Sequence, residues 1–496
     1  MVQNLQDFIS NINSFAVNVS QICNKILCFN VLFWQNDIQM PFLIAFLLFS
    51  SIYFFAIFGF VNFKFMAYAI RTFFSSKLNS YQEKMVKTLG SQYQTSRKIV
   101  FFVAGGGIDL GSIFGVSAIV SFAGLGTIFW MLIISVLSSS VRFAEVFAAH
   151  YFRTTDEKAK SVFGGPQIYI KKAFEMINMP MLGKFMALVF SLALGLSTFC
   201  SLQVNQTVMI ITHFVPQTQP YTLFISIAIS AIILSLLTLS FKTITNISSV
   251  VVPLMARVYI ASTVIIILFN FHNIAPTINE IFSDALSLKS GFAGVLATIV
   301  VATQRTFFCN ETGMGSGAIS HANSINKDSI LEGIISTITP VVSIAIICVC
   351  SGFIAGITGA FRESTDGIYI IMKSFATVHE YFPILLIVVV PLFGVTTAVA
   401  WAYYGQRVWI GIFGAKTLIV YNVLLFLAYC VSGSVSDFTV ILNIADILGL
   451  AIAIPNIISL IVLSRFIVKK LRARYAQKNM MDFDEKSLDS FTQSVE

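Results

Sequence analysis

Two acidic residues, Asp109 and Glu311, lie within glycine-rich segments that interrupt long apolar stretches of the chain. These segments are residues 105–115 and 310–317. Every backbone N–H and C=O inside a membrane must be bonded, so a broken helix is tolerated only where it is buried in protein or lines a polar cavity. Breaks at corresponding places in two halves of a chain indicate a site for a substrate or an ion. The alternative is that the glycines only allow close helix packing.

The composition indicates that these segments lie in a membrane. Of the 496 residues, 56% are hydrophobic and 11% are charged, and 48 are Phe. A soluble globular protein of this length needs far more charge. The net charge of +8 does not predict nucleic-acid binding, because the basic residues lie between or after the apolar spans. Neither the cysteines nor the five histidines show a metal-ligand spacing, and we expect no cofactor.

A helix needs about 20 apolar residues to cross the hydrocarbon layer. On this criterion we predict eleven spans, with a short amphipathic segment at 274–286. The predicted spans are 40–60, 99–122, 127–149, 181–212, 221–239, 250–271, 293–314, 330–357, 382–404, 417–432 and 442–467.

The distribution of Lys and Arg predicts the orientation of these spans. With eleven spans, four basic segments all fall on one side of the membrane. They are the loops around 61–98 and 151–180, the turn between 404 and 417, and the tail. Short cytoplasmic loops carry an excess of Lys and Arg. We therefore expect a multi-pass protein of the bacterial cytoplasmic (inner) membrane, with the N-terminus outside and the C-terminus in the cytoplasm.

Without the first span, the remaining ten divide into two units of five, and each unit begins with a glycine-interrupted helix. An odd number of spans per unit makes the two units antiparallel, which is the inverted-repeat plan of many carriers. The expected organisation is an N-terminal segment with the first span and a cytoplasmic loop, a first repeat, an external amphipathic segment, a second repeat and a cytoplasmic tail. In residue numbers these are 1–98, 99–271, 272–292, 293–467 and 468–496.

Several motifs, in order along the chain, resemble those of the alanine/glycine:cation symporter family. FFCNETGMGS at 307–316 is similar to the family signature FSNEAG(L/M)GS, and TTAVAWAYYG at 396–405 is similar to TTxxGWxYYG. The resemblance covers about residues 40–464, and further matches are GLGTIFWM at 124–131, RFAEV at 142–146, GGPQIYI at 164–170, ADI at 445–447 and AIPN at 453–456. It implies an all-α leucine-transporter fold of five plus five helices with one extra N-terminal helix, and transport of small amino acids with Na+ or H+.

The resemblance also implies which residues form the sites. The substrate pocket is expected to include the first break, and the indole of Trp401 is expected to limit the size of the substrate. The residues of this pocket would be Asp109, Leu110, Gly111, Gln203, Phe308, Thr397 and Trp401. A Na+ site needs five or six hard oxygens. The hydroxyls of Thr396 and Thr397 would face carbonyls near Ile108 and Gly111. Otherwise, a Thr in an apolar helix bonds to its own preceding turn.

This chain departs from the family pattern at the first break, where Asp109 replaces a glycine and Ser112 replaces an amide. An acid at this depth costs about 2.5–3.5 kcal/mol on insertion scales. An ionised Asp109 would repel a substrate carboxylate, and it could pair with an amine or bind the coupling cation. A protonated Asp109 could carry the proton of an H+-coupled variant. A structural contact to Ser112 or to a helix N-terminus is the remaining alternative. Ser343 also stands where the family has Asp.

Other polar residues are assigned structural or gating roles. Glu311, with Gly313 and Gly315 after it, is expected to brace the second broken helix rather than to contact the ligand. Arg142 and Glu145, three residues apart, are expected to form a helix-surface pair or a gate latch near the cytoplasmic end.

The sequence thus predicts a secondary transporter rather than an enzyme, taking up a small amino acid such as alanine or glycine with Na+ or H+ by alternating access. Its expected partners are that substrate and membrane lipid, without nucleic acid. An enzyme would need a nucleophile, base or metal cluster that this chain lacks. Two alternatives remain open. One is a carrier of the same fold for an amine or another small solute, because of Asp109; the other is an amino-acid sensor that binds without transport.

Overall fold

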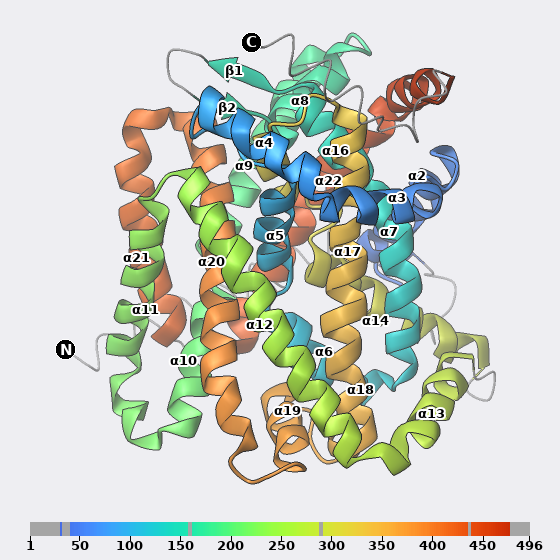
Figure 1. Cartoon of the computed structure of the whole chain (residues 1–496), viewed down its shortest axis with the longest axis vertical. Coiled ribbons are helices and arrows are strands. Elements are labelled where there is room, and N and C mark those ends of the chain that lie inside the picture. The colour runs from blue at the N-terminus through green and yellow to red at the C-terminus, as the bar shows by residue number, and fades with distance from the viewer. Residues whose placement is uncertain (1–29, 32–39, 157–160, 287–290, 435–437, 477–496) are drawn as a thin grey trace.

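The computed structural model describes residues 30–31, 40–156, 161–286, 291–434 and 438–476, and it is almost entirely helical (Figure 1). Most of the expected N-terminal segment before the first span and of the cytoplasmic tail therefore lies outside the described residues. The first half contains helices α2 (Phe42–Ile57), α3 (Val61–Phe74), α4 (Ser76–Leu89), α5 (Ser96–Gly107), the π-helix η1 (Gly111–Gly115), α6 (Val116–Ala123), α7 (Gly126–Tyr151), α8 (Pro166–Glu175), α9 (Pro180–Ser197), α10 (Leu202–Phe214), η2 (Pro216–Tyr221), α11 (Thr222–Leu237) and α12 (Phe241–Phe269).

The second half repeats this pattern of long helices and short connections. It contains η3 (Phe271–Asn273), α13 (Ile274–Leu286), α14 (Gly291–Asn310), α15 (Ser316–His321), α16 (Ser329–Ser336), α17 (Ile338–Val342), η5 (Ser343–Cys348), α18 (Val349–Thr358), η6 (Ala360–Arg362), α19 (Gly367–Ala376), η7 (Phe382–Ile384), α20 (Leu385–Phe413), η8 (Ala415–Thr417), α21 (Leu418–Ser434) and α22 (Phe438–Ala476). The described strands β1 (Thr154–Asp156) and β2 (Ser161–Phe163) form an antiparallel hairpin in which Thr155 pairs with Val162.

Both predicted helix breaks are confirmed. The first separates α5 from η1, and the axis bends there by 57°. The second separates α14 from α15. A third bend, of 78°, lies between α2 and α3, where Gly59 and Phe60 have φ of 63° and 60°. It turns α3 away from the direction of the first span.

Eight helices among the described residues are long and apolar enough to cross a membrane, or up to ten if each bent pair counts as one span. The expected span at 293–314 corresponds to α14, which is not among those ten. The amphipathic segment predicted at 274–286 is confirmed as α13. Hydropathy marked only the apolar part of some helices: α12 begins at Phe241, nine residues before the predicted start at Val250, because its first turns contain Lys and Thr.

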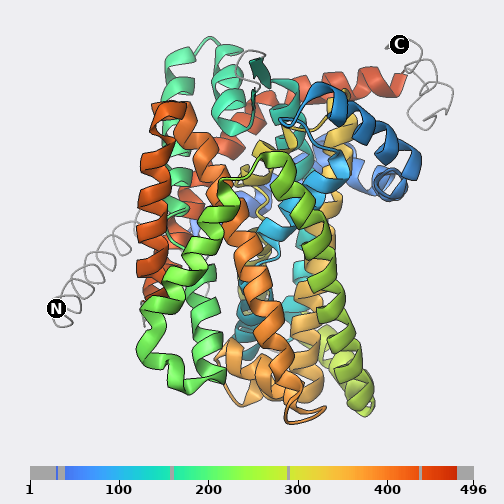
Figure 2. The ribbon, with the colours of Figure 1, turned by 60° about the vertical axis from the view of Figure 1, so that its left-hand side comes forward.

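Helix α7 is the most buried of the long helices. It packs against α2, α13, α14, α15, α16 and α17, and its second half from Ser138 to Ala149 is almost completely inaccessible. Four serines on α7, Ser135 and Ser138–Ser140, are fully buried. Small residues of this kind allow close approach of helices in a membrane, where lipid supplies no hydrophobic force between them. In the turned view most of the long helices run roughly along the vertical axis, whereas the last part of α22 lies across the top (Figure 2).

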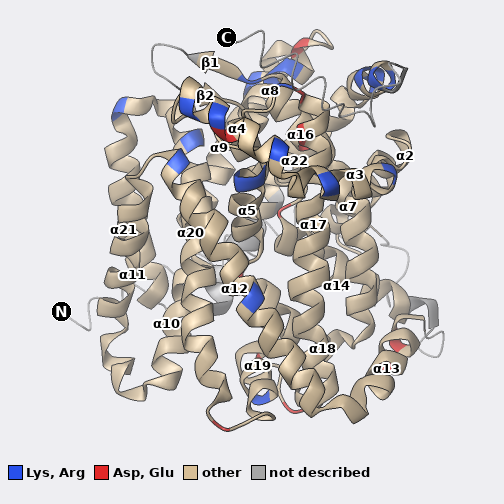
Figure 3. Ribbon diagram, in the orientation of Figure 1, with Lys and Arg blue, Asp and Glu red and all other residues tan. Residues whose placement is uncertain are grey.

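The charged residues lie mainly at the end of the bundle that carries α4, α8 and the hairpin (Figure 3). Most of the bundle between its two ends is uncharged in this view (Figure 3). The polar residues of the two helix breaks, inside this uncharged region, are therefore exceptional.

Candidate functional site

Asp109 caps the second half of the first broken helix, which begins at η1. Helix α5 ends at Gly107, and the N–H of Asp109 bonds to the Gly107 carbonyl at 3.0 Å. The N–H and the hydroxyl of Ser112 donate to Asp109 Oδ1 at 2.9 and 3.2 Å. A carboxylate on the first free N–H groups of a helix is favourable, because it meets the positive end of the helix dipole. The expected structural contact between Asp109 and Ser112 is therefore present.

Arg305 on α14 lies against the same break, and sequence reasoning missed this contact. Its Nη2 donates to the Gly111 carbonyl at 2.5 Å. A Cβ added at Gly115 would lie 1.2 Å from Nη2, so only glycine leaves room for the guanidinium. The positive charge of Arg305 also acts on the Asp109 carboxylate. Two signals could have revealed this contact: a cation within an apolar span, and two glycines four residues apart in the facing helix.

The second break is a tight loop with left-handed backbone. Glu311 has φ of 53°, which is rare for a residue other than glycine, and Gly313 and Gly315 have φ of 85° and 70°. The Ser316 hydroxyl donates to Glu311 Oε2 at 2.7 Å. Glu311 is buried and does not line the cavity described below. Its role as a brace stays a prediction.

Arg142 and Glu145 hold the two ends of this second break. Arg142 Nη2 donates to the Asn310 carbonyl at the end of α14, at 2.6 Å. The N–H of Gly315, at the start of α15, donates to Glu145 Oε1 at 2.9 Å. The expected helix-surface pair near the cytoplasmic end is therefore wrong: both side chains are 0% exposed, with 3.4 Å between Arg142 Nη1 and Glu145 Oε2. A surface pair and a buried brace have the same spacing in the sequence, and the spacing alone could not distinguish them.

Two further residues complete the brace. Asn456 Nδ2 donates to Glu145 Oε1 at 2.8 Å and to the Gly313 carbonyl at 2.7 Å. The Tyr169 hydroxyl donates to Asn456 Oδ1 at 2.5 Å. The loop is thus tied to α7, α8 and α22 by buried hydrogen bonds, which explains why polar residues recur in these otherwise apolar helices.

A cavity lies beside both breaks and encloses about 590 Å³, including the space at its mouth. Four predicted substrate residues line it, namely Asp109, Gln203, Phe308 and Trp401. The other lining residues are Gly106, Ser197, Thr198, Cys200, Ser201, Leu202, Met314, Tyr429 and Gly449. Leu110, Gly111 and Thr397 are not among the lining residues, and Leu110 and Thr397 are fully buried.

Sequence analysis missed the polar wall formed by residues 197–201. Residues 198–201 separate α9 from α10, in a span that was predicted as one continuous helix. Ser201 caps α10, since its hydroxyl accepts from the N–H of Val204 at 3.2 Å. The signal was the segment STFCS, in which every residue except Phe199 is small and carries a hydroxyl or thiol group, without glycine or proline.

A cluster of hard oxygens lies behind the first break. The Thr397 hydroxyl is 2.7 Å from the Gly105 carbonyl and 3.4 Å from the Ile108 carbonyl. The Thr396 hydroxyl bonds within its own helix, to the carbonyls of Leu392 and Phe393 at 2.9 and 3.0 Å. Carbonyls and hydroxyls gathered in this way suit a small hard cation. The Gly111 carbonyl instead accepts from Arg305, and Gly105 takes its place beside Thr397.

Two other observations concern metal ligands. Ser343 bonds to the carbonyls of Thr339 and Pro340 in its own helix, at 2.9 and 3.2 Å. Among the described residues, no group of three or more His, Cys, Asp or Glu side chains could hold a metal ion.

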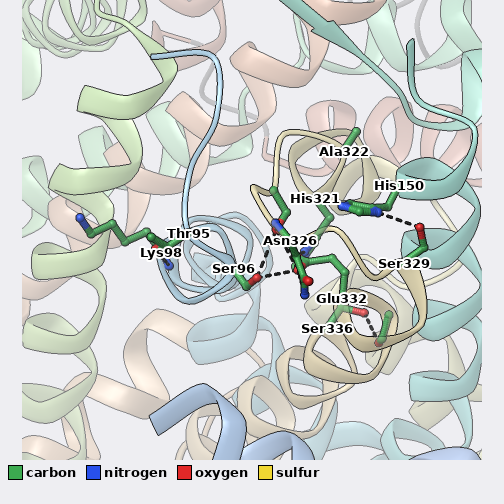
Figure 4. A network of polar contacts seen from close by, with 12 residues as sticks. Thr95, Ser96, Lys98, His150, His321, Ala322, Asn326, Ser329, Glu332 and Ser336 are labelled. Carbon is green, nitrogen blue, oxygen red and sulfur yellow. Dashed lines mark hydrogen bonds and ion pairs between the residues drawn. The ribbon is translucent and has the colours of Figure 1, made fainter. Parts of the chain in front are cut away.

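A buried polar network joins the start of α5 to α16 and to the chain after α15 (Figure 4). Glu332 on α16 lies at the centre of this network. Its Oε2 accepts from the hydroxyls of Ser96 and Ser324 at 2.6 and 2.8 Å, and its Oε1 lies 2.6 Å from His321 Nδ1. The chain before α5 pairs with the chain after α15, since the N–H of Ile325 donates to the Gln94 carbonyl at 2.9 Å. The starts of α5 and α16 are therefore held together here.

The model of a known family, "Sodium:alanine symporter family", matches residues 22–489 of this chain. The chain is 25% identical to the sodium/alanine symporter AgcS of Methanococcus maripaludis over 443 residues, which cover 87% of this chain and 94% of AgcS. It is 29% identical to an uncharacterized transporter of Haemophilus influenzae over 389 residues, covering 76% and 83% of the two chains.

Among solved structures, the chain resembles MhsT in complex with L-phenylalanine, with a TM-score of 0.55 and 12% identity. The match covers 77% of this chain and 98% of MhsT, a transporter of the leucine-transporter fold. At this identity the likeness concerns the fold alone.

Replacing Gly115 by Ala should destabilise the protein. The added Cβ displaces the Arg305 guanidinium, and the loss of its bond to Gly111 should lower the free energy of unfolding by about 1–3 kcal/mol. Thermal unfolding of the purified chain in detergent measures this effect. Gly195→Ala is the control, because the nearest atom to its added Cβ is 3.9 Å away. Equal melting temperatures for the two variants would contradict the packing of Arg305 described above.

Replacing Glu332 by Gln should loosen the polar network. One acceptor oxygen becomes an NH2 group that faces hydrogen-bond donors, at a cost of about 1–3 kcal/mol. Hydrogen–deuterium exchange should then rise at residues 94–96 and 322–328. Glu363→Gln is the control, since Glu363 pairs with Lys373 at the surface, where an ion pair contributes about 0–1 kcal/mol. Unchanged exchange in the Glu332 variant would show that the network does not hold these segments.

Proposed function

Because this chain belongs to the sodium:alanine symporter family, we propose that it is a Na+-coupled symporter of a small amino acid, such as alanine or glycine, that works by alternating access. The chain is a membrane transporter and not an enzyme. The observation that carries the proposal is the position of the cavity, which is lined by residues from both broken helices and lies beside the cluster of hard oxygens behind the first break.

The proposed topology has eleven spans, with antiparallel repeats at 99–271 and 293–467, an N-terminus outside and a C-terminus in the cytoplasm of a bacterium. A helix break near the start of each proposed repeat, at Gly107–Gly111 and at Asn310–Ser316, supports this arrangement. The concentration of Lys and Arg at one end of the bundle supports the orientation, with that end in the cytoplasm (Figure 3).

The proposed substrate site is the cavity. Gln203 offers an amide for hydrogen bonds, and Phe308 and Trp401 form apolar walls that limit the size of the side chain. Leu110, Gly111 and Thr397 would act from behind the wall, by fixing the shape of the break.

The proposed Na+ site is formed by the carbonyls of Gly105 and Ile108 and the hydroxyl of Thr397. The hydroxyl of Thr396, which bonds within its own helix in the structure, would have to turn to become a further ligand. Binding of Na+ there would join α5 to α20 across the first break. One cation moving through 100 mV gains about 2.3 kcal/mol. Each tenfold Na+ gradient adds about 1.4 kcal/mol. These two terms together can accumulate an amino acid several hundredfold.

In the proposed cycle, the network around Glu332 closes the cytoplasmic route while the cavity faces the other side. Opening that route requires α5 to separate from α16, and therefore the bonds of Ser96 and Gln94 to break. Binding of Na+ and substrate at the breaks supplies the free energy that shifts the balance between the two states.

Counterflow of labelled alanine in proteoliposomes, with Na+ and pH varied separately, tests this function. We expect exchange that requires Na+ on the side of the label. A Na+-independent, pH-driven exchange would indicate H+ coupling instead. Saturable binding of alanine without counterflow would contradict transport and indicate a sensor.

Replacing Thr397 by Val should lower the affinity of the transporter for Na+. The variant loses a hydroxyl ligand, and the Na+ concentration for half-maximal uptake should rise about tenfold, which corresponds to about 1.4 kcal/mol. Uptake as a function of Na+ concentration measures this change. Thr212→Val is the control, because the Thr212 hydroxyl bonds only within α10 in the structure. An unchanged Na+ requirement in the Thr397 variant would exclude this cation site.

A further inference from the structure

The charge on the cavity wall limits which solute the wall can bind. Asp109 contributes a carboxylate, and no Lys, Arg or His is among the described lining residues. An ionised ligand in a site of low dielectric needs a counter-charge at short range. The wall offers such a counter-charge to an ammonium group and does not offer one to a carboxylate.

Protein carboxylates already bind the N–H groups at both breaks, where a substrate carboxylate would be expected to bind. At the first break, Asp109 accepts from the N–H of Ser112 at 2.9 Å. At the second, Glu145 accepts from the N–H of Gly315 at 2.9 Å. A ligand carboxylate at the first break would therefore compete with Asp109 and be repelled by it.

Arg305 does not reverse this charge pattern. It is not among the lining residues, and its Nη2 is bonded to the Gly111 carbonyl. Both bonds from Ser112 end on Oδ1 of Asp109. A carboxylate has about four acceptor positions, so Asp109 retains capacity for the N–H groups of a ligand.

We propose that Asp109 binds the ammonium group of the transported solute, and that small primary amines without a carboxylate bind at least as tightly as alanine. This inference rests on the proposed function, because it takes the cavity as the transport site. The polar groups of the opposite wall, including Thr198, Ser201 and Gln203, then face the rest of the solute. The substrate class is defined by one positive group and a small body that fits between Phe308 and Trp401.

The test compares alanine with its two fragments on the purified full-length chain in Na+ buffer. Ethylamine is alanine without the carboxylate, and propionate is alanine without the ammonium group. We expect ethylamine to raise the melting temperature at concentrations equal to or below those needed for alanine. Propionate should have no effect at tenfold higher concentration. The proposal is overturned if propionate raises the melting temperature. It is also overturned if alanine raises the melting temperature and ethylamine does not.

Variants of Asp109 separate charge recognition from folding. Asp109→Asn should raise the concentration of ethylamine for half-maximal stabilisation about thirtyfold or more. Asp109→Glu, which keeps the charge, should bind ethylamine more tightly than Asp109→Asn does. Asp366→Asn is the matched control, because Asp366 is an exposed helix cap and Asn caps equally well. If Asp109→Asn changes the Na+ requirement and leaves ethylamine binding unaltered, Asp109 serves the cation and the proposal fails.

Failure of this inference can be distinguished from failure of the proposed function. Counterflow of alanine that ethylamine does not inhibit leaves the function standing and rejects the inference. Stabilisation by ethylamine that depends on Asp109, without alanine counterflow, supports the inference and rejects alanine as the substrate. If alanine shows no counterflow and ethylamine does not stabilise the protein, both the proposed function and this inference are rejected.

Discussion

The structure depends on how a broken helix is stabilised at the depth of the membrane. A free backbone N–H or C=O in hydrocarbon costs several kcal/mol. At the second break, Arg142 bonds the carbonyl at the end of α14 and Glu145 bonds the N–H before α15. Each charge matches the helix end that it meets, positive at the carbonyl end and negative at the N–H end. The two side chains also neutralise each other, so neither is a lone charge in the interior.

The first break uses the same arrangement with different partners. Arg305 reaches a carbonyl beside the break from the facing helix, and Asp109 caps the N–H of Ser112. The glycines at 111 and 115 leave the space that the guanidinium fills. The two breaks differ in where the acid lies. Glu145 is fully buried behind the loop, whereas Asp109 forms part of the cavity wall. An acid that braces a helix can therefore also face a ligand.

Local patterns in the sequence predicted the broken helices and the amphipathic helix α13, because glycine-rich interruptions and periodicity are properties of short segments. The resemblance to a known family also identified four residues of the cavity wall, two of which, Phe308 and Trp401, lie in the family motifs. The partners of the breaks were not predictable in this way. Arg305 is 194 residues from Gly111, and the burial of Arg142 depends on which helices surround α7. The break between α9 and α10 was also missed, since Ser and Thr are common in membrane helices that remain continuous.

The charge of the solute determines how much work the membrane potential can do. A zwitterion carries no net charge, so the field acts only on the coupled Na+, which gains about 2.3 kcal/mol per 100 mV. An ammonium solute carries a second positive charge, and the same field then supplies about 4.6 kcal/mol to the transported pair. Asp109 remains in the protein and balances one of these charges inside the cavity. A single acid in the wall would therefore change both the solute that is bound and the driving force for its accumulation.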